Sequence, residues 1–159
     1  MRSLLGELAT GGTNEEVTVM DMEASIEHMS RATTRHVDAM LMVAEPYFRS
    51  LETVGRIAPL AQELGIEHIW VVANKVRSPR DEEILRAYCS ERGIEVGGVV
   101  PFDEAIQEAD REGRALIDYE PAAPAVGAIG RIADLLEEQV MGARSNGSPG
   151  KSDGRGDQS

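Results

Sequence analysis

The chain has 159 residues, a formal net charge of -12 and a single cysteine, Cys89. This length fits one domain, and the acidic balance argues against nonspecific nucleic-acid or anionic-membrane partners, because both need a positive surface potential. One cysteine excludes an internal disulfide and a cysteine-rich metal site within the chain. No apolar run approaches the length of about 18 residues that a membrane span needs, and no signal pattern is present, so we expect a cytoplasmic protein.

The first part of the chain predicts a short helix and then a buried strand. Leucines at helical spacing indicate the helix over residues 2–8. Residues 17–23 (VTVMDME) are apolar until Asp21 and Glu23, a pattern typical of a buried parallel strand whose carboxyl end opens into a site. Asp21 is well placed there to hold a magnesium ion or its water. Spacing alone leaves an alternative open, in which Asp21 caps a helix that starts near Ser25.

Strands and helices alternate through the rest of the chain. We expect strands over residues 38–45, 68–73 and 96–100, and helices over residues 25–35, 50–64, 79–93, 103–112 and 122–140. No hairpin signal separates successive strands, which favours an α/β fold with a parallel sheet flanked by helices. From Gly142 the composition turns to small and polar residues, which predicts a disordered tail over residues 142–159 after one domain over residues 1–141.

Polar residues follow the ends of the expected strands. Carboxyl ends of parallel strands lie at one edge of a sheet, where nucleotides bind in open α/β folds, so we expect these residues to lie together. On spacing alone, a plain turn residue is the alternative for Asn74. The residues that follow the four strands are Asp21 and Glu23, then Glu45, then Asn74 and Lys75, and finally Pro101, Phe102 and Asp103.

Four segments of the chain form an ordered set that is more specific than any one of them alone. They are DMEASIEHMSRAT from Asp21, VAEPYFRSLET from Val43, VANKV from Val72 and PFDEAIQEADREG from Pro101. This set resembles the nickel-insertion accessory ATPases of carbon monoxide dehydrogenase, within the MinD/ParA-like branch of P-loop ATPases. The resemblance covers roughly residues 1–138.

The resemblance implies a P-loop NTPase domain that binds ATP and magnesium. In such proteins the aspartate that matches Asp21 is the Walker B residue, which helps to hold magnesium. The asparagine that matches Asn74 reads the adenine edge, and the segment that matches residues 101–103 packs near the base. An amide suits the adenine edge because it offers both a donor and an acceptor. Glu23 and Lys75 adjoin these positions and complete the expected nucleotide-binding set.

The phosphate-binding loop of the family has no counterpart in this sequence. A P-loop needs a glycine-rich turn that follows a strand and ends in Lys and then Ser or Thr. Residues 11–13 (GGT) lack the lysine and precede a strand, and residues 150–152 (GKS) lie in the expected tail with no strand before them. The family's Cys-x-Cys metal pair is also missing. The sequence therefore resembles the C-terminal half of the family's domain.

A half-domain of this kind has consequences for activity and for folding. We expect ATP-binding accessory function without independent ATP hydrolysis, and a homodimer, a full-length relative or a carbon monoxide dehydrogenase-type client as partner. The alternative is a noncatalytic interaction module that docks on a relative or client. In the family the P-loop strand lies between the Walker B strand and the strand that follows it in sequence, so residues 17–23 either pair directly with residues 38–44 or leave a gap. Both arrangements predict low stability or dependence on a partner.

Overall fold

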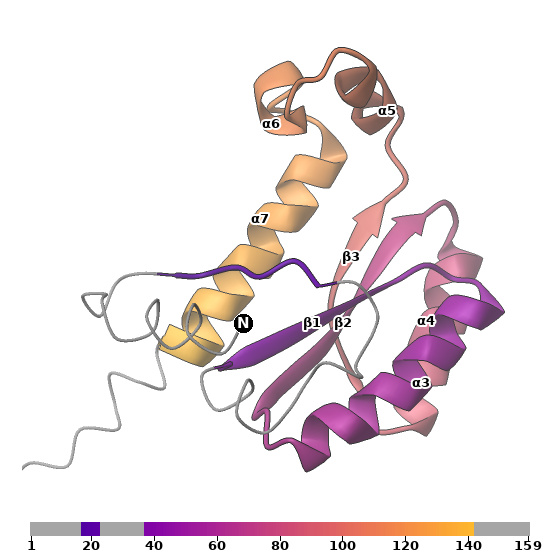
Figure 1. Ribbon diagram of the computed structural model, residues 1–159. Coiled ribbons are helices and arrows are strands. Elements are labelled where there is room, and N and C mark those ends of the chain that lie inside the picture. Colours follow the sequence, from indigo (N-terminus) through magenta and orange to yellow (C-terminus); the bar gives the residue numbers. More distant parts are fainter. Residues whose placement is uncertain (1–16, 23–36, 142–159) are drawn as a thin grey trace, which may run out of the picture.

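The computed structural model describes residues 17–22 and 37–141, and its centre is a sheet of three parallel strands in the order β1-β2-β3 (Figure 1). The strands are β1 (Ala39–Ala44), β2 (His68–Val76) and β3 (Glu95–Pro101). β1 pairs regularly with β2 along its whole length, whereas the pairing of β2 with β3 shifts register twice. The predicted α/β fold class is confirmed.

Helices cover both faces of this sheet. On one face lie α3 (Phe48–Glu63) and α4 (Pro79–Glu91), and on the other lies α7 (Pro124–Leu136), which continues into the π-helical turn η2 (Glu137–Met141) (Figure 1). Two shorter helices, α5 (Glu104–Arg111) and α6 (Leu116–Tyr119), lie beyond the carboxyl end of β3 and away from the sheet. Only α6 had no counterpart among the predicted helices of the described residues.

Two apolar clusters hold these layers together, because successive side chains of a strand point to opposite faces. The cluster under α3 and α4 contains Met42, Ala44, Leu51, Val54, Ala58, Val71, Ala73, Leu85 and Cys89. The cluster under α7 contains Val72, Val100, Ala125, Ala128 and Ile132. A Cβ atom on Gly98 would collide with the side chain of Ile132, so glycine allows α7 to lie directly on β3.

Local sequence signals explain where the helices begin and end. The Ser78 hydroxyl accepts a hydrogen bond from the Asp81 N–H (3.2 Å), and the Asp81 carboxylate accepts one from the Ser78 N–H (3.1 Å). This reciprocal capping box starts α4 at Pro79, whose missing N–H costs nothing in a first turn. Gly65, with a φ of 83°, follows α3 and takes the left-handed conformation that ends many helices.

The structure corrects the prediction for residues 17–23. Residues 17–22 form no strand and pair with none of β1, β2 and β3, and their side chains are exposed, Val19 at 87%. An extended segment without a neighbouring strand has no partners for its backbone groups and no reason to be buried. This is the gapped arrangement of the two that the sequence allowed. Glu23, the expected helices over residues 2–8 and 25–35 and the tail over residues 142–159 lie outside the described residues.

Candidate functional site

The carboxyl ends of β2 and β3 form the best-defined part of the expected site. The Phe102 N–H donates a hydrogen bond to the Val76 carbonyl oxygen at 2.8 Å, and Val76 is paired with Pro101 in the sheet. This connection places the end of the central strand, with Asn74 and Lys75, at the same sheet edge as Pro101 and Phe102. The five predicted site residues of β2 and β3 thus share one edge, as the parallel topology requires.

Asn74 and Lys75 sit in a local irregularity of β2. The β2-β3 register shifts between Ala73 and Val76, and Lys75 has a φ of 55°, in the left-handed region that few residues other than glycine adopt. The Asn74 side-chain oxygen accepts a hydrogen bond from the Lys75 N–H at 3.0 Å, which supports this turn of the backbone. Backbone strain of this kind concentrates at binding sites, and here it presents a half-buried amide at the end of the central strand.

An ion pair links the ends of β1 and β2. The Lys75 ammonium lies 2.7 Å from Glu45 Oε1, and the hydrogen bond and the negative charge of Glu45 raise the pKa of Lys75. The Glu45 N–H in turn donates to the Ser50 hydroxyl at 3.0 Å, which ties the end of β1 to the first turn of α3. Glu45 takes one of the three N–H donors of the Lys75 ammonium, so this exposed lysine keeps donors for a further acceptor.

Arg77 belongs to this edge although the sequence analysis did not select it. Its guanidinium carbon lies 3.4 Å from the centre of the Phe102 ring, a cation–π contact that joins the segments after β2 and β3. Its backbone N–H donates to the Asp81 carboxylate at 2.9 Å. The sequence did offer a signal for this contact: Arg77 follows one predicted strand, and the aromatic Phe102 follows the next predicted strand. One face of the Phe102 ring is therefore covered by a charge.

Asp103 accepts two backbone hydrogen bonds that serve two helices. Its Oδ1 accepts from the Ala105 N–H (3.0 Å) as the N-cap of α5, and its Oδ2 accepts from the Ala125 N–H (3.3 Å) in the first turn of α7. Carboxylates are favourable at helix N-termini because they satisfy free N–H groups and interact well with the helix dipole. Both carboxylate oxygens of Asp103 therefore accept hydrogen bonds that stabilise helices. Its expected contact with a base stays a prediction.

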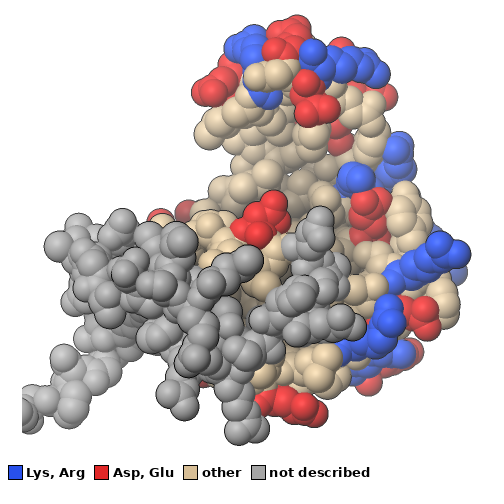
Figure 2. All heavy atoms as spheres, in the orientation of Figure 1, with Lys and Arg blue, Asp and Glu red and all other residues tan. Residues whose placement is uncertain are grey.

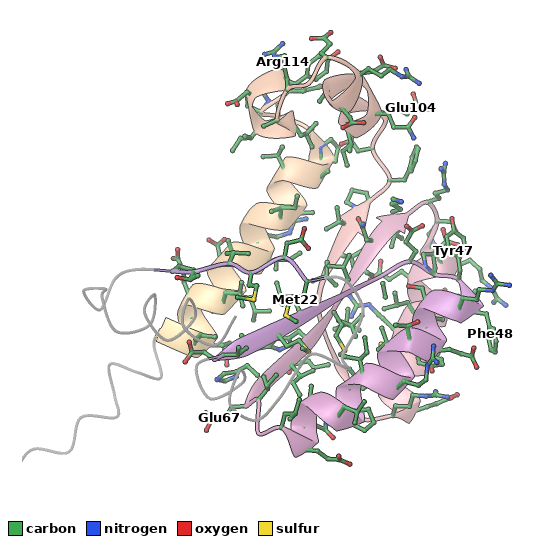
Figure 3. The ribbon with its side chains drawn as sticks, viewed as in Figure 1. Met22, Tyr47, Phe48, Glu67, Glu104 and Arg114 are labelled. Carbon is green, nitrogen blue, oxygen red and sulfur yellow. The ribbon has the colours of Figure 1, made fainter. Side chains whose placement is uncertain are left out.

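The structure does not include Asp21 in a strand of the sheet, because residues 17–22 form none. Asp21 is exposed, and Figure 3 draws its neighbour Met22 apart from Tyr47, which follows β1. Across residues 17–22 and 37–141, no group of three or more His, Cys, Asp or Glu side chains is arranged to hold a metal ion. Magnesium needs only one or two protein carboxylates beside waters and phosphate oxygens, so Asp21 stays a predicted ligand, and Glu23 lies outside the described residues.

Two exposed aromatic residues extend the edge beyond the Glu45–Lys75 ion pair. An open hollow at the start of α3 is lined by Glu45, Tyr47, Phe48, Arg49 and Ser50. Figure 3 shows Tyr47 and Phe48 at this end of the molecule.

Cys89 is buried in the core, where burial raises the pKa of its thiol, so it is a packing residue and no nucleophile. None of the described helices combines the length and apolarity that a membrane crossing requires.

Comparison with known proteins shows what the chain is related to. The carbon monoxide dehydrogenase accessory protein CooC of Rhodospirillum rubrum is 40% identical over 122 residues, which are 77% of this chain and 45% of that protein. The chain is homologous to CooC. An uncharacterised ATP-binding protein of Methanocaldococcus jannaschii is 44% identical over 103 residues, which are 64% of this chain and 40% of that protein. No family model matches the chain.

Solved structures agree on the fold. The MinD cell division protein of Aquifex aeolicus aligns with a TM-score of 0.59 and 19% identity, over 72% of this chain and 50% of that one. The fold is therefore that of MinD/ParA P-loop ATPases, as the resemblance implied. The chain spans less than half the length of the curated relatives that it matches, and this partial coverage fits the C-terminal half of their domain.

Proposed function

We propose that this CooC homologue carries the base-binding side of an ATP site in a cytoplasmic accessory protein for nickel insertion into carbon monoxide dehydrogenase. The observation that carries the proposal is the half-buried amide of Asn74 at the end of the central strand, in a chain 40% identical to CooC. The printed name of the Methanocaldococcus jannaschii relative, an ATP-binding protein, supports the choice of nucleotide. Nickel insertion rests on CooC alone.

The chemistry of Asn74 suits adenine. Its side-chain oxygen has two lone pairs, and one of them accepts a hydrogen bond from the Lys75 N–H. This hydrogen bond fixes the orientation of the amide. One acceptor position and the two amide hydrogens remain for a ligand. Adenine presents an amino donor next to a ring-nitrogen acceptor, and a bidentate pair with an asparagine amide satisfies both. Guanine presents an acceptor where adenine has the amino donor, so the same amide discriminates between the two bases.

The chain alone would lack the groups that bind the phosphates of ATP. Its sequence has no glycine-rich loop with a lysine after a strand, and Lys75 is paired with Glu45. To bind magnesium through Asp21, residues 17–22 would have to move to the sheet edge. The phosphate oxygens of bound ATP would bind the metal there as well. We therefore propose that the chain alone does not hydrolyse ATP, because a P-loop supplies the phosphate contacts on which that chemistry depends.

A second candidate function is a noncatalytic interaction module that docks on a full-length relative or on the client enzyme. It is favoured by one feature, the exposed apolar side chains of residues 17–22. Such a module would fold and dock without nucleotide. The two candidates are therefore separated by whether nucleotide binds at all.

Saturation-transfer NMR, which detects weakly bound ligands, tests whether the chain binds the adenine base. It measures magnetisation transferred from the protein to the protons of the nucleotide. With the wild-type chain and ATP, we expect transfer to the adenine protons and little transfer to the guanine proton of GTP. Asn74→Ala is expected to abolish the adenine signal. Gln107→Ala, on the exposed surface of α5, is the matched control and is expected to leave the signal unchanged.

Two results would contradict this function. Equal transfer to ATP and GTP would mean that no base is read, and an adenine signal that survives Asn74→Ala would place the nucleotide elsewhere. Absence of any signal with the folded wild-type chain would favour the interaction module.

A further inference from the structure

Arg77 and Phe102 form a stacked pair at the edge of the sheet that carries Asn74. The guanidinium carbon of Arg77 lies 3.4 Å from the centre of the Phe102 ring. An edge-on guanidinium at this distance would push a nitrogen into the ring, because its nitrogens extend about 1.3 Å from the carbon. The planar group therefore lies flat on the ring. Arg77 is exposed, so the opposite face of its guanidinium is open to a second planar group.

The guanidinium of Arg77 has no carboxylate partner among the described residues. This is unusual in a chain with 28 acidic and 16 basic residues, where acids outnumber cations. Figure 2 shows that Lys and Arg side chains gather on the right of the molecule, where β2 ends and α3 begins. Glu45 raises the pKa of Lys75, and the positive charge of Arg77 works against that rise. The Arg77 cation therefore lies near Lys75, which directly follows Asn74.

Backbone hydrogen bonds hold this stacked pair in place. The Phe102 N–H donates to the Val76 carbonyl oxygen at 2.8 Å. The Arg77 N–H donates to the Asp81 carboxylate at 2.9 Å. Both donors are main-chain groups, so a change of the Arg77 side chain leaves these two hydrogen bonds intact. Variants of Arg77 can therefore be compared without loss of the fold at this edge.

We infer that the open face of the Arg77 guanidinium stacks on the nucleotide base whose edge Asn74 reads. Guanidinium planes stack on bases as they do on aromatic rings, because their positive charge is attracted to the negative face of the π-system. Asn74 then pairs with the base in its plane, and Arg77, supported by Phe102, covers the base from one side. The inference rests on the proposed adenine site and adds a contact that does not depend on the donors and acceptors of the base.

Adenosine is the probe that tests this inference, because it has the base without the phosphates that any cation attracts. Its dissociation constant is measured by saturation-transfer NMR titration of the full 159-residue chain, and ATP is titrated in parallel. Arg77→Met removes the charge and the planar group, whereas Arg77→Lys keeps the charge and loses only the plane. Arg80→Met, in the exposed first turn of α4, is the matched control for loss of a charge. Circular dichroism of each variant confirms that it is folded.

We expect Arg77→Met to raise the dissociation constant of adenosine about fivefold, which is the size of one cation–π contact. Arg77→Lys is expected to raise it about threefold, because an ammonium group has no plane to stack on the base. Arg80→Met is expected to leave it unchanged.

Several results would overturn the inference. An unchanged or lower constant in Arg77→Met would mean that the base does not stack on Arg77. Equal weakening by Arg80→Met, or a wild-type constant in Arg77→Lys, would mean that charge alone matters. An effect of Arg77→Met on ATP but not on adenosine would assign Arg77 to the phosphates.

The variant Asn74→Ala separates failure of this inference from failure of the proposed function. If Asn74→Ala abolishes adenosine binding and Arg77→Met does not weaken it, the base site stands and only the stacking contact is refuted. If the folded wild-type chain shows no transfer to adenosine or to ATP, the proposed function is refuted and this inference with it.

Discussion

The two sides of the sheet differ in how completely they are packed. On the β3 side, α7 lies directly on the strand, and Gly98 gives Ile132 the space to do so. On the β1 side, the face that carries Val43 has no helix of the described residues packed over it, and Val43 is exposed. Both strands carry the sequence pattern of buried β-structure, but only one side has the elements that bury it.

This difference shows which side of the sheet is packed among the described residues and which side is open. Burial of apolar surface is the main favourable term in folding, and its value is lost wherever a strand lacks a neighbour. The β2–β3 half also holds the defined part of the candidate site, with Asn74 and Phe102 at one edge. Asp21 is exposed within residues 17–22, which pair with none of the three strands.

The largest expected effect contrasts a packed side chain with an open one. Leu85 is fully buried between α4 and the sheet, so Leu85→Ala is expected to lower the free energy of unfolding by about 2–5 kcal/mol. Val43→Ala is expected to change it by no more than about 0.5 kcal/mol, because Val43 is mostly exposed. Urea unfolding followed by circular dichroism measures both. A cost for Val43→Ala as large as that for Leu85→Ala would show that the β1 face is covered in the chain alone.

The contact between α7 and β3 provides a second test of the packed side. A methyl group on Gly98 would collide with Ile132, so Gly98→Ala is expected to lower the free energy of unfolding by about 1–3 kcal/mol. Gly130→Ala, on α7 with nothing near the added methyl group, is the matched control and is expected to be neutral or slightly stabilising. The same urea titration applies. A neutral Gly98→Ala would mean that α7 is not held against β3.

Asp103 links the candidate site to α7, because it caps α5 and accepts a hydrogen bond from the first turn of α7. Asp103→Ala is expected to lower the free energy of unfolding by about 0.5–2 kcal/mol. Asp103→Asn keeps one side-chain oxygen, so it is expected to retain part of that stability. Equal losses for the two variants would indicate that the charge matters and the individual hydrogen bonds do not.

The smallest expected effect concerns the exposed ion pair at the β1–β2 end. Glu45 raises the pKa of Lys75, so the lysine stays charged and paired at neutral pH and loses this partner's stabilisation as the pH rises through the raised value. In NMR titrations, Glu45→Gln is expected to lower the pKa of Lys75 towards its ordinary value. Because both groups are at the surface, stability at neutral pH should hardly change. An unchanged pKa in Glu45→Gln would show that the pair does not persist in solution.

Apolar runs predicted the three observed strands, because each strand buries at least one face under the helices. The same pattern in residues 17–23 gave a wrong prediction, since a sequence shows what a strand needs and not whether a neighbour is present. α6 was missed because four residues are too few for a helical period to be recognised.

Part of the candidate site followed from strand ends, and part did not. Asn74, Lys75, Pro101 and Phe102 share an edge because parallel topology brings carboxyl ends together. The contact of Arg77 with Phe102 depends on how two loops turn after their strands, which sequence spacing does not specify. For Asp103, a capping role for α5 is local, but its hydrogen bond to α7 spans 22 residues and depends on tertiary packing.

The central claim is that this chain holds the base side of a nucleotide site and lacks the phosphate and metal side. Calorimetric titration of the 159-residue chain with ATP, with and without magnesium, tests it most directly. We expect no magnesium-dependent binding and the same result for Asp21→Ala, because residues 17–22 form no strand of the sheet and the sequence has no P-loop to hold the phosphates. Magnesium-dependent ATP binding that weakens in Asp21→Ala would contradict it, since the site would then be complete within this chain.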